Sequence, residues 1–218
     1  MVKFKPYVIL SAATSIDGKI ATVTGDSKLS SKHDSIRLHK LRSKVDAILV
    51  GKNTVLLDDP MLTVRHTRGK NPIRIILDSK GTLSRNSKII QTSNKFPTII
   101  AVSNKITKSN LEKLNKFPIE IIVAGNNTID IKLLLKKLSE KKIKSILVEG
   151  GGTINWEFIK QDLFDELIIT LSPFLIGGKD AVSLVEGSGF GKISNSPNLR
   201  LKSIKRLKNH LVLNYTKV

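Results

Sequence analysis

Residues 146–156 read ILVEGGGTINW and join an apolar run, through three consecutive glycines, to a helical pattern. The run of Ile, Leu and Val predicts a buried strand. Glycine permits a tight turn after it, and the first N–H groups of the next helix then point outward at the positive end of the helix dipole. The stretch therefore indicates an anion site for a dinucleotide pyrophosphate, with a tightly packed turn as the alternative. The Gly-x-Gly-x-x-Gly fingerprint is absent.

Similar apolar runs recur along the chain and predict further buried strands. They lie at 8–10, 47–50, 73–77, 98–102, 119–124 and 167–171. Helical patterns lie between several of them, at 34–45 and at 131–141, where Asp130 is a candidate N-cap. Strands that alternate with helices predict an α/β fold with a mostly parallel central sheet and helices on both faces. Alternating strands at 199–204 and 211–215 predict an antiparallel C-terminal hairpin that turns near 208–210.

Composition sets the class of protein. The 218 residues contain no linker-like stretch, so we expect a single domain over 1–218. Residues 1–6 lack the apolar region of a signal peptide and no run is long enough to span a bilayer, so we expect a cytoplasmic protein without a membrane partner. There are 0 cysteines, which excludes thiolate metal sites and the zinc-deaminase signature. The four histidines lack paired-ligand spacing, so no metal site is expected.

The net charge of +19 indicates attraction to polyanions or to phosphorylated small molecules. Nucleic-acid binding is one interpretation of this charge. Only 5% of the residues are aromatic, however, and no nucleic-acid-binding motif is present. Lys and Arg are scattered along the chain, so an ordinary solvated surface explains most of the charge, and the charge alone does not identify the anion. We expect a phosphorylated small-molecule ligand and no nucleic acid.

Polar residues follow three of the other predicted strands, where open α/β sheets bind their ligands. The stretch SIDGKIA at 15–21 is either part of a site or a simple Asp-Gly turn. In 50–65, a short polar turn contains Thr54. The carboxylate of Asp58 or Asp59 could bind sugar hydroxyls or stabilise a cation, and Arg65 could hold a phosphate. In 78–82, Lys80 and neighbouring hydroxyls could hold a 2′-phosphate and select NADPH. The alternative is a loop-ending Asp-Asp-Pro sequence for the first of these two stretches and a surface turn for the second.

Taken together, these stretches resemble the reductases of riboflavin biosynthesis, which have the dihydrofolate-reductase-like fold. The resemblance rests on SIDGK (15–19), HKLR (39–42), VG through DDPMLT (50–63), residues 74–79, VEGGGT (148–153) and residues 173–178, which occur in the family's order. Bacterial members often carry Lys in the first strand where this chain has Ser11. In this respect the chain is similar to the archaeal form.

The resemblance implies roles for individual residues. It places Arg42 and Arg65 at the 5′-phosphate of the substrate, with Asp58 and Glu149 near its ribose as candidate catalytic residues. It implies an NADPH site built by Thr54, Asp58, Ser79, Lys80, Thr82, Leu83, Ser84, Gly150, Gly151, Gly152, Thr153 and Asn155.

The resemblance also implies a reaction. The expected activity is NADPH-dependent reduction of the ribosyl group of 2,5-diamino-6-ribosylamino-4(3H)-pyrimidinone 5′-phosphate to ribityl, by hydride transfer to C1′. Reduction of the deaminated pyrimidine, or of a pterin-like heterocycle, by the same fold is the alternative. Family members are usually homodimers, so a homodimer is expected.

Overall fold

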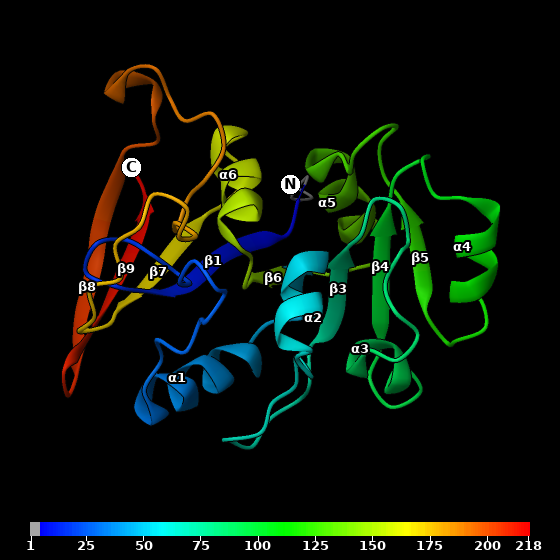
Figure 1. Ribbon diagram of the computed structural model, residues 1–218, viewed down its shortest axis with the longest axis horizontal. Coiled ribbons are helices and arrows are strands. Elements are labelled where there is room, and N and C mark those ends of the chain that lie inside the picture. Colours follow the sequence, from blue (N-terminus) through cyan, green and yellow to red (C-terminus); the bar gives the residue numbers. More distant parts are fainter. Residues whose placement is uncertain (1–4) are drawn as a thin grey trace.

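The computed structural model describes residues 5–218, so residues 1–4 of the expected domain lie outside the described residues. Within residues 5–218, nine strands form one sheet in the order β5-β4-β3-β2-β6-β1-β7-β9-β8 (Figure 1). The strands are β1 (Tyr7–Thr14), β2 (Ala47–Gly51), β3 (Ile73–Leu77), β4 (Thr98–Val102), β5 (Glu120–Val123), β6 (Ser145–Val148), β7 (Glu166–Leu171), β8 (Leu199–Leu207) and β9 (His210–Lys217).

The seven strands β1 to β7 run parallel to one another. β9 is antiparallel to β7, and β8 is antiparallel to β9, with a register shift between Leu201 and Ser203. This hairpin forms one edge of the sheet, at the left of Figure 1. The predicted parallel sheet with an antiparallel C-terminal hairpin is therefore confirmed.

Six α-helices and one 3₁₀ turn connect these strands within the described residues. They are α1 (Lys32–Arg42), α2 (Lys52–Asp58), α3 (Lys88–Gln91), α4 (Lys108–Leu114), α5 (Ile131–Glu140), α6 (Gly152–Lys160) and η1 (Ile193–Asn195). The predicted N-cap at Asp130 is confirmed, since its carboxylate accepts from the Leu133 N–H at 2.9 Å. Ser31 caps α1 in the same way, through the N–H of Asp34.

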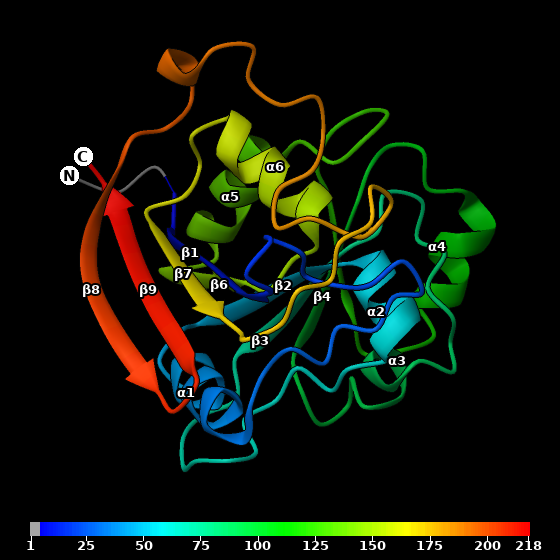
Figure 2. The ribbon, with the colours of Figure 1, turned by 60° about the vertical axis from the view of Figure 1, so that its left-hand side comes forward.

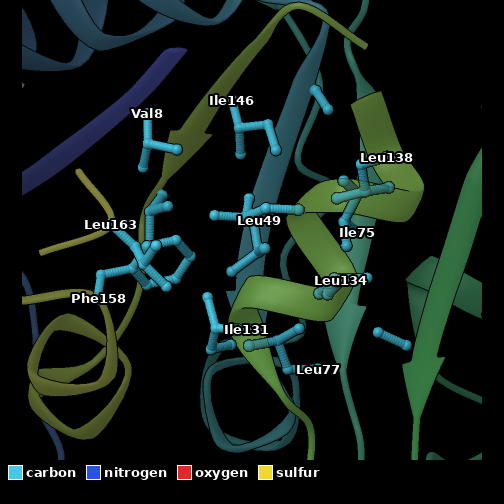
Figure 3. Packing of buried hydrophobic residues seen from close by; sticks show 14 of the residues in the cluster. Val8, Leu49, Ile75, Leu77, Ile131, Leu134, Leu138, Ile146, Phe158 and Leu163 are labelled. Carbon is cyan, nitrogen blue, oxygen red and sulfur yellow. The ribbon is translucent and has the colours of Figure 1, made fainter. Parts of the chain in front are cut away.

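The helices cover both faces of the sheet (Figure 2). α5 places Ile131, Leu134 and Leu138 against Leu49 and Ile75 of the strands (Figure 3). On the opposite face, α1 contributes Leu38 and Leu41 to a cluster with Ile9, Leu147 and Ile168. The strands are buried on both sides, which explains their continuous apolar sequences. None of the helices in residues 5–218 has the length and apolar character required to cross a membrane.

Arg74, the second residue of β3, is an exception in this core, because its charged side chain is 0% exposed. Its guanidinium donates to the hydroxyls of Thr98 and Thr92 and to the carbonyls of Met61, Ile89 and Phe96, at 2.6 to 3.3 Å. Burial lowers its pKa to about 10. Because a buried charge is tolerated only when it is fully hydrogen-bonded, Arg74 fixes the segment that follows α2.

Candidate functional site

A cavity of about 780 Å³ opens at the carboxyl ends of β1, β2, β3 and β6. It is the edge of the sheet where parallel α/β folds bind ligands. Its walls come from α1 on one side, α2 and the turn after β3 on another, and the glycine turn before α6 on a third. Residues from four of the predicted stretches, 39–42, 50–63, 74–79 and 148–153, are therefore brought together here, although they are far apart in the sequence.

The three glycines of the β6–α6 turn have different surroundings. A Cβ on Gly150 would lie 2.7 Å from Ile154, and one on Gly152 would lie 2.3 Å from the carbonyl oxygen of Ser183. A Cβ on Gly151 would have nothing within 4 Å. Gly151 is also the N-cap of α6 and has no side chain to bond the first N–H groups. The turn thus combines two tightly packed glycines with one that faces the open cavity, which fits an anion.

The segment 184–186, for which the sequence predicted no functional role, packs against the start of α6. The Glu186 N–H donates to the carbonyl of Gly152, and the Thr153 hydroxyl donates to the Glu186 carboxylate at 3.0 Å. The Asn155 amide donates to the carbonyl of Leu184 at 2.8 Å. Thr153 lines the cavity with Glu186, whereas Asn155 is buried beneath it and is not among the lining residues.

Thr54 and Asp58 lie in α2, which corrects the prediction of a short polar turn at this position. Their spacing of four residues places both on the helix face that lines the cavity. Desolvation raises the pKa of Asp58, and a hydrogen bond with Ser27 opposes the rise. Asp59 has a structural role instead, because it ends α2 in the left-handed conformation and its carboxylate accepts from the N–H of Lys88 at 2.8 Å.

The turn after β3 also contains both residues that line the cavity and residues that stabilise the turn. Ser79 and Lys80 line the cavity. Asp78 also lines the cavity, but it is buried and stabilises the turn, because its carboxylate accepts from the Leu83 N–H at 2.8 Å and from the Thr82 hydroxyl at 3.3 Å. Thr82, Leu83 and Ser84 are not among the lining residues, and Leu83 packs into the core.

Arg42 and Glu149 meet in the cavity wall. Nε and Nη2 of Arg42 donate to the two carboxylate oxygens of Glu149 at 2.7 and 2.6 Å, and Nη1 donates to the carbonyl of Thr63 at 3.2 Å. Burial disfavours the charge of Arg42, but the attraction and hydrogen bonds of Glu149 outweigh this, so the pKa of Arg42 is raised. All three guanidinium nitrogens are therefore committed to protein acceptors in this structure.

Arg65 is exposed and is not among the residues that line the cavity. Its backbone N–H donates to Nδ1 of His39 at 3.0 Å. His39 lies in α1, about one helical turn before Arg42. His39 is buried, and burial together with the charge of Arg42 lowers its pKa to about 4. His39 and Arg42 thus hold the 63–65 segment from α1, while the predicted phosphate contact of Arg65 stays a prediction.

The Asp-Gly turn after β1 has a mainly structural position. The Asp17 carboxylate accepts from the N–H groups of Ile176 and Gly177 at 3.0 and 2.6 Å, which ties this turn to the loop after β7. A hydrogen bond with Ser15, followed by those two backbone bonds, lowers the pKa of Asp17. Only Ile20 and Ala21 of this stretch line the cavity.

Two cavity residues, Asp34 and Arg37, carried no predicted role. Asp34 is 1% exposed and forms an ion pair of 2.7 Å with Arg37. Their spacing of three residues on one helix was visible in the sequence, but such pairs are common on solvated helices. What distinguishes this pair is the burial of Asp34, which the sequence does not reveal.

Comparison with known proteins gives a consistent result. A family model described as the RibD C-terminal domain matches residues 6–213. The chain is 39% identical over 215 residues to the 2,5-diamino-6-ribosylamino-4(3H)-pyrimidinone 5′-phosphate reductase of Methanothermobacter thermautotrophicus, covering 97% of this chain and 98% of that protein. It is 41% identical over 204 residues to the reductase of the same name from Aquifex aeolicus, covering 91% of each.

Solved structures agree on the fold. Acinetobacter baumannii RibD superposes with a TM-score of 0.84 at 25% identity, covering 99% of this chain and 59% of that chain. A dihydrofolate reductase from Enterococcus faecalis, solved with NADP(H), gives a TM-score of 0.55 at 11% identity, covering 97% of this chain and 96% of that chain. The expected dihydrofolate-reductase-like fold is therefore confirmed.

Proposed function

Because the chain belongs to the RibD C-terminal domain family, we propose that it is the reductase that converts the ribosyl group of 2,5-diamino-6-ribosylamino-4(3H)-pyrimidinone 5′-phosphate to ribityl. Two relatives of this name align over nearly their whole length. The observation that carries the proposal is the single cavity in which Asp58, Glu149 and the Gly151 turn meet. We treat the described residues as one reductase domain, since all strands join one sheet.

The cofactor in this proposal is NADPH. Gly150, Gly151, Gly152 and Thr153 would hold its pyrophosphate, since the open space at Gly151 and the uncapped start of α6 suit an anion. Lys80 and Ser79, at the cavity edge, would hold the 2′-phosphate. Thr54 and Asp58 complete the lining on the α2 side. Thr82, Leu83, Ser84 and Asn155 would contribute by shaping these segments. When bound, the reduced nicotinamide supplies a hydride.

The carboxylates of the cavity act on the sugar. Opening of the ribose ring leaves positive charge on C1′ and its nitrogen, and a carboxylate close to C1′ stabilises that charge. Glu149 is suited to this role because the two-bonded contact with Arg42 fixes its orientation. Asp58 is the candidate for proton transfer, because its raised pKa brings the carboxyl group nearer to neutral pH.

The remaining assignments follow from the resemblance. Arg65 would bind the 5′-phosphate as its exposed guanidinium swings toward the cavity, with Arg42 behind it. The net charge of +19 supports an anionic substrate. The enzyme would work in the cytoplasm, as a homodimer.

Turnover with a substrate panel tests the proposal. We expect the purified protein to oxidise NADPH with the diamino substrate and to give a product heavier by two hydrogen atoms. Turnover restricted to the deaminated pyrimidine or to a dihydropterin would transfer the assignment to those alternatives. If none of the three compounds supported NADPH oxidation, the proposed function would be refuted.

A further inference from the structure

A polar cluster around Asp34 of α1 lies at the cavity and has no part in the function proposed above. The Asp34 carboxylate accepts from Nε of Arg37 at 2.7 Å, from the Thr170 hydroxyl at 2.6 Å and from the Ser30 hydroxyl at 2.7 Å. Nη2 of Arg37 in turn donates to the Thr170 hydroxyl at 3.2 Å. The guanidinium of Arg37 is therefore held in a fixed orientation by α1 and β7.

Arg37 keeps unused donors in that orientation. A guanidinium has five N–H groups, and two of them are used by Asp34 and Thr170. Within residues 5–218, Nη1 of Arg37 has no hydrogen-bond partner. The side chain is 19% exposed and lines the cavity. By contrast, all three nitrogens of Arg42 donate to protein acceptors. Arg37 is thus the guanidinium of the cavity wall that has donors available for a ligand.

A second polar group on the same wall also lacks a partner. Ser11 is 5% exposed and lines the cavity, and within the described residues its hydroxyl has no hydrogen-bond partner. Ser11 pairs with Ile168 and Ala13 with Thr170 in the β1–β7 register, so these side chains project from the same face of the sheet. A buried hydroxyl normally has a partner, so this wall is suited to a polar ligand.

The charges of the Asp34–Arg37 pair indicate which part of the substrate Arg37 would bind. Asp34, at 2.7 Å, cancels most of the electric field of Arg37. The electrostatic attraction between this pair and a phosphate dianion is therefore weak. A neutral carbonyl oxygen needs only directed N–H donors, which Arg37 offers. Resting on the proposed function, we propose that Arg37 is a substrate-binding residue that donates to the ring carbonyl of the pyrimidinone, with Asp34 and Thr170 as its positioning residues.

The test distinguishes binding of the base from binding of the phosphate. In Arg37→Met, KM for the diamino substrate should rise at least about tenfold, as expected when a charged donor is lost. Inhibition by ribose 5-phosphate, which has the sugar phosphate but no base, should stay within about twofold of the wild type. Equal weakening of both would show that Arg37 binds the phosphate and would overturn the proposal. An unchanged KM would overturn it as well.

Folding of the variant is controlled separately, because Arg37→Met leaves Asp34 buried without its cation. The double variant Asp34→Asn with Arg37→Met removes both charges and should give the same KM pattern. Thermal unfolding of each protein confirms that it is folded.

A binding measurement keeps the inference independent of turnover. Calorimetry with free 2,6-diamino-4(3H)-pyrimidinone, in the presence of NADPH, should show binding to the wild type that is at least about tenfold weaker in Arg37→Met. This result would hold even if the protein reduced none of the ribosyl compounds, in which case only the proposed reaction would fail. No binding to the wild type, or equal binding to both proteins, would overturn the role of Arg37.

Discussion

The Arg42 guanidinium and the Glu149 carboxylate form two parallel hydrogen bonds of 2.7 and 2.6 Å across the cavity wall. The two residues are 107 positions apart in the sequence, and the contact joins α1 to the end of β6. A carboxylate fixed in this way is already oriented when substrate binds, so it can stabilise charge without reorganising.

Replacement of Glu149 by Gln should therefore lower kcat. We expect a loss of roughly hundredfold or more, with the affinity for NADPH nearly unchanged. The buried pair is broken as well, which should lower the thermal midpoint. Steady-state kinetics beside thermal unfolding separate the two effects, and Glu149→Asp, which retains the charge, serves as the matched control. Full turnover and normal substrate affinity in Glu149→Gln would contradict a catalytic role.

The glycine turn offers a matched pair of variants. Gly151 has a φ of −72° and open space for a Cβ, so Gly151→Ala should fold with an almost unchanged thermal midpoint. Its methyl group would occupy the cavity, and we expect NADPH binding to weaken about tenfold or more. In Gly152→Ala the Cβ would meet the Ser183 carbonyl at 2.3 Å, so stability itself should fall. Normal NADPH titration of Gly151→Ala would place the cofactor elsewhere.

Lys80 tests the preference for the phosphorylated cofactor. Lys80→Ala should weaken NADPH binding roughly fivefold to tenfold and leave NADH binding unchanged, because only NADPH has the 2′-phosphate. The difference should shrink as salt is added, since Lys80 is exposed. Lys95→Ala makes the same change of charge at an exposed position outside the cavity and is the control. Equal weakening of both cofactors would exclude a role for Lys80 in selection.

His39 gives the fold a pH dependence. Its pKa is about 4 in the folded protein against 6.5 ordinarily, so the unfolded chain binds a proton first as the pH falls. Stability should therefore drop between about pH 6.5 and pH 4, by roughly 2 to 3 kcal/mol from this group. His39→Gln retains an acceptor for the Arg65 N–H but does not titrate. Urea unfolding across this range should show a shallower loss in the variant, and parallel curves would refute the assignment.

The elements that the sequence predicted are those with the strongest local patterns. Buried parallel strands such as β2 and β4 are continuous apolar runs, and α5 has its apolar residues on one face. α2 was interpreted as a turn because Gly51, Lys52 and Asn53 favour turns, and only tertiary packing makes this seven-residue segment helical.

Within the site, the sequence predicted that polar stretches follow the carboxyl ends of several strands, but it did not show which side chains face the cavity. Asp58 lines it, while its neighbour Asp59 caps a helix. The contact between Asp34 and Thr170 spans 136 positions, and no local pattern marks it. Such distinctions depend on burial and on long-range contacts, which a single sequence does not encode locally.

Transfer of an isotope tests the central claim most directly. NADPH deuterated at C4 of the nicotinamide, on one face and then on the other, is incubated with the diamino ribosyl phosphate, and the product is examined by mass spectrometry and NMR. If the chain is the proposed reductase, one of the two labelled cofactors delivers one deuterium to C1′ of the ribityl chain. A ribityl product without deuterium from either cofactor, or no ribityl product, would contradict it.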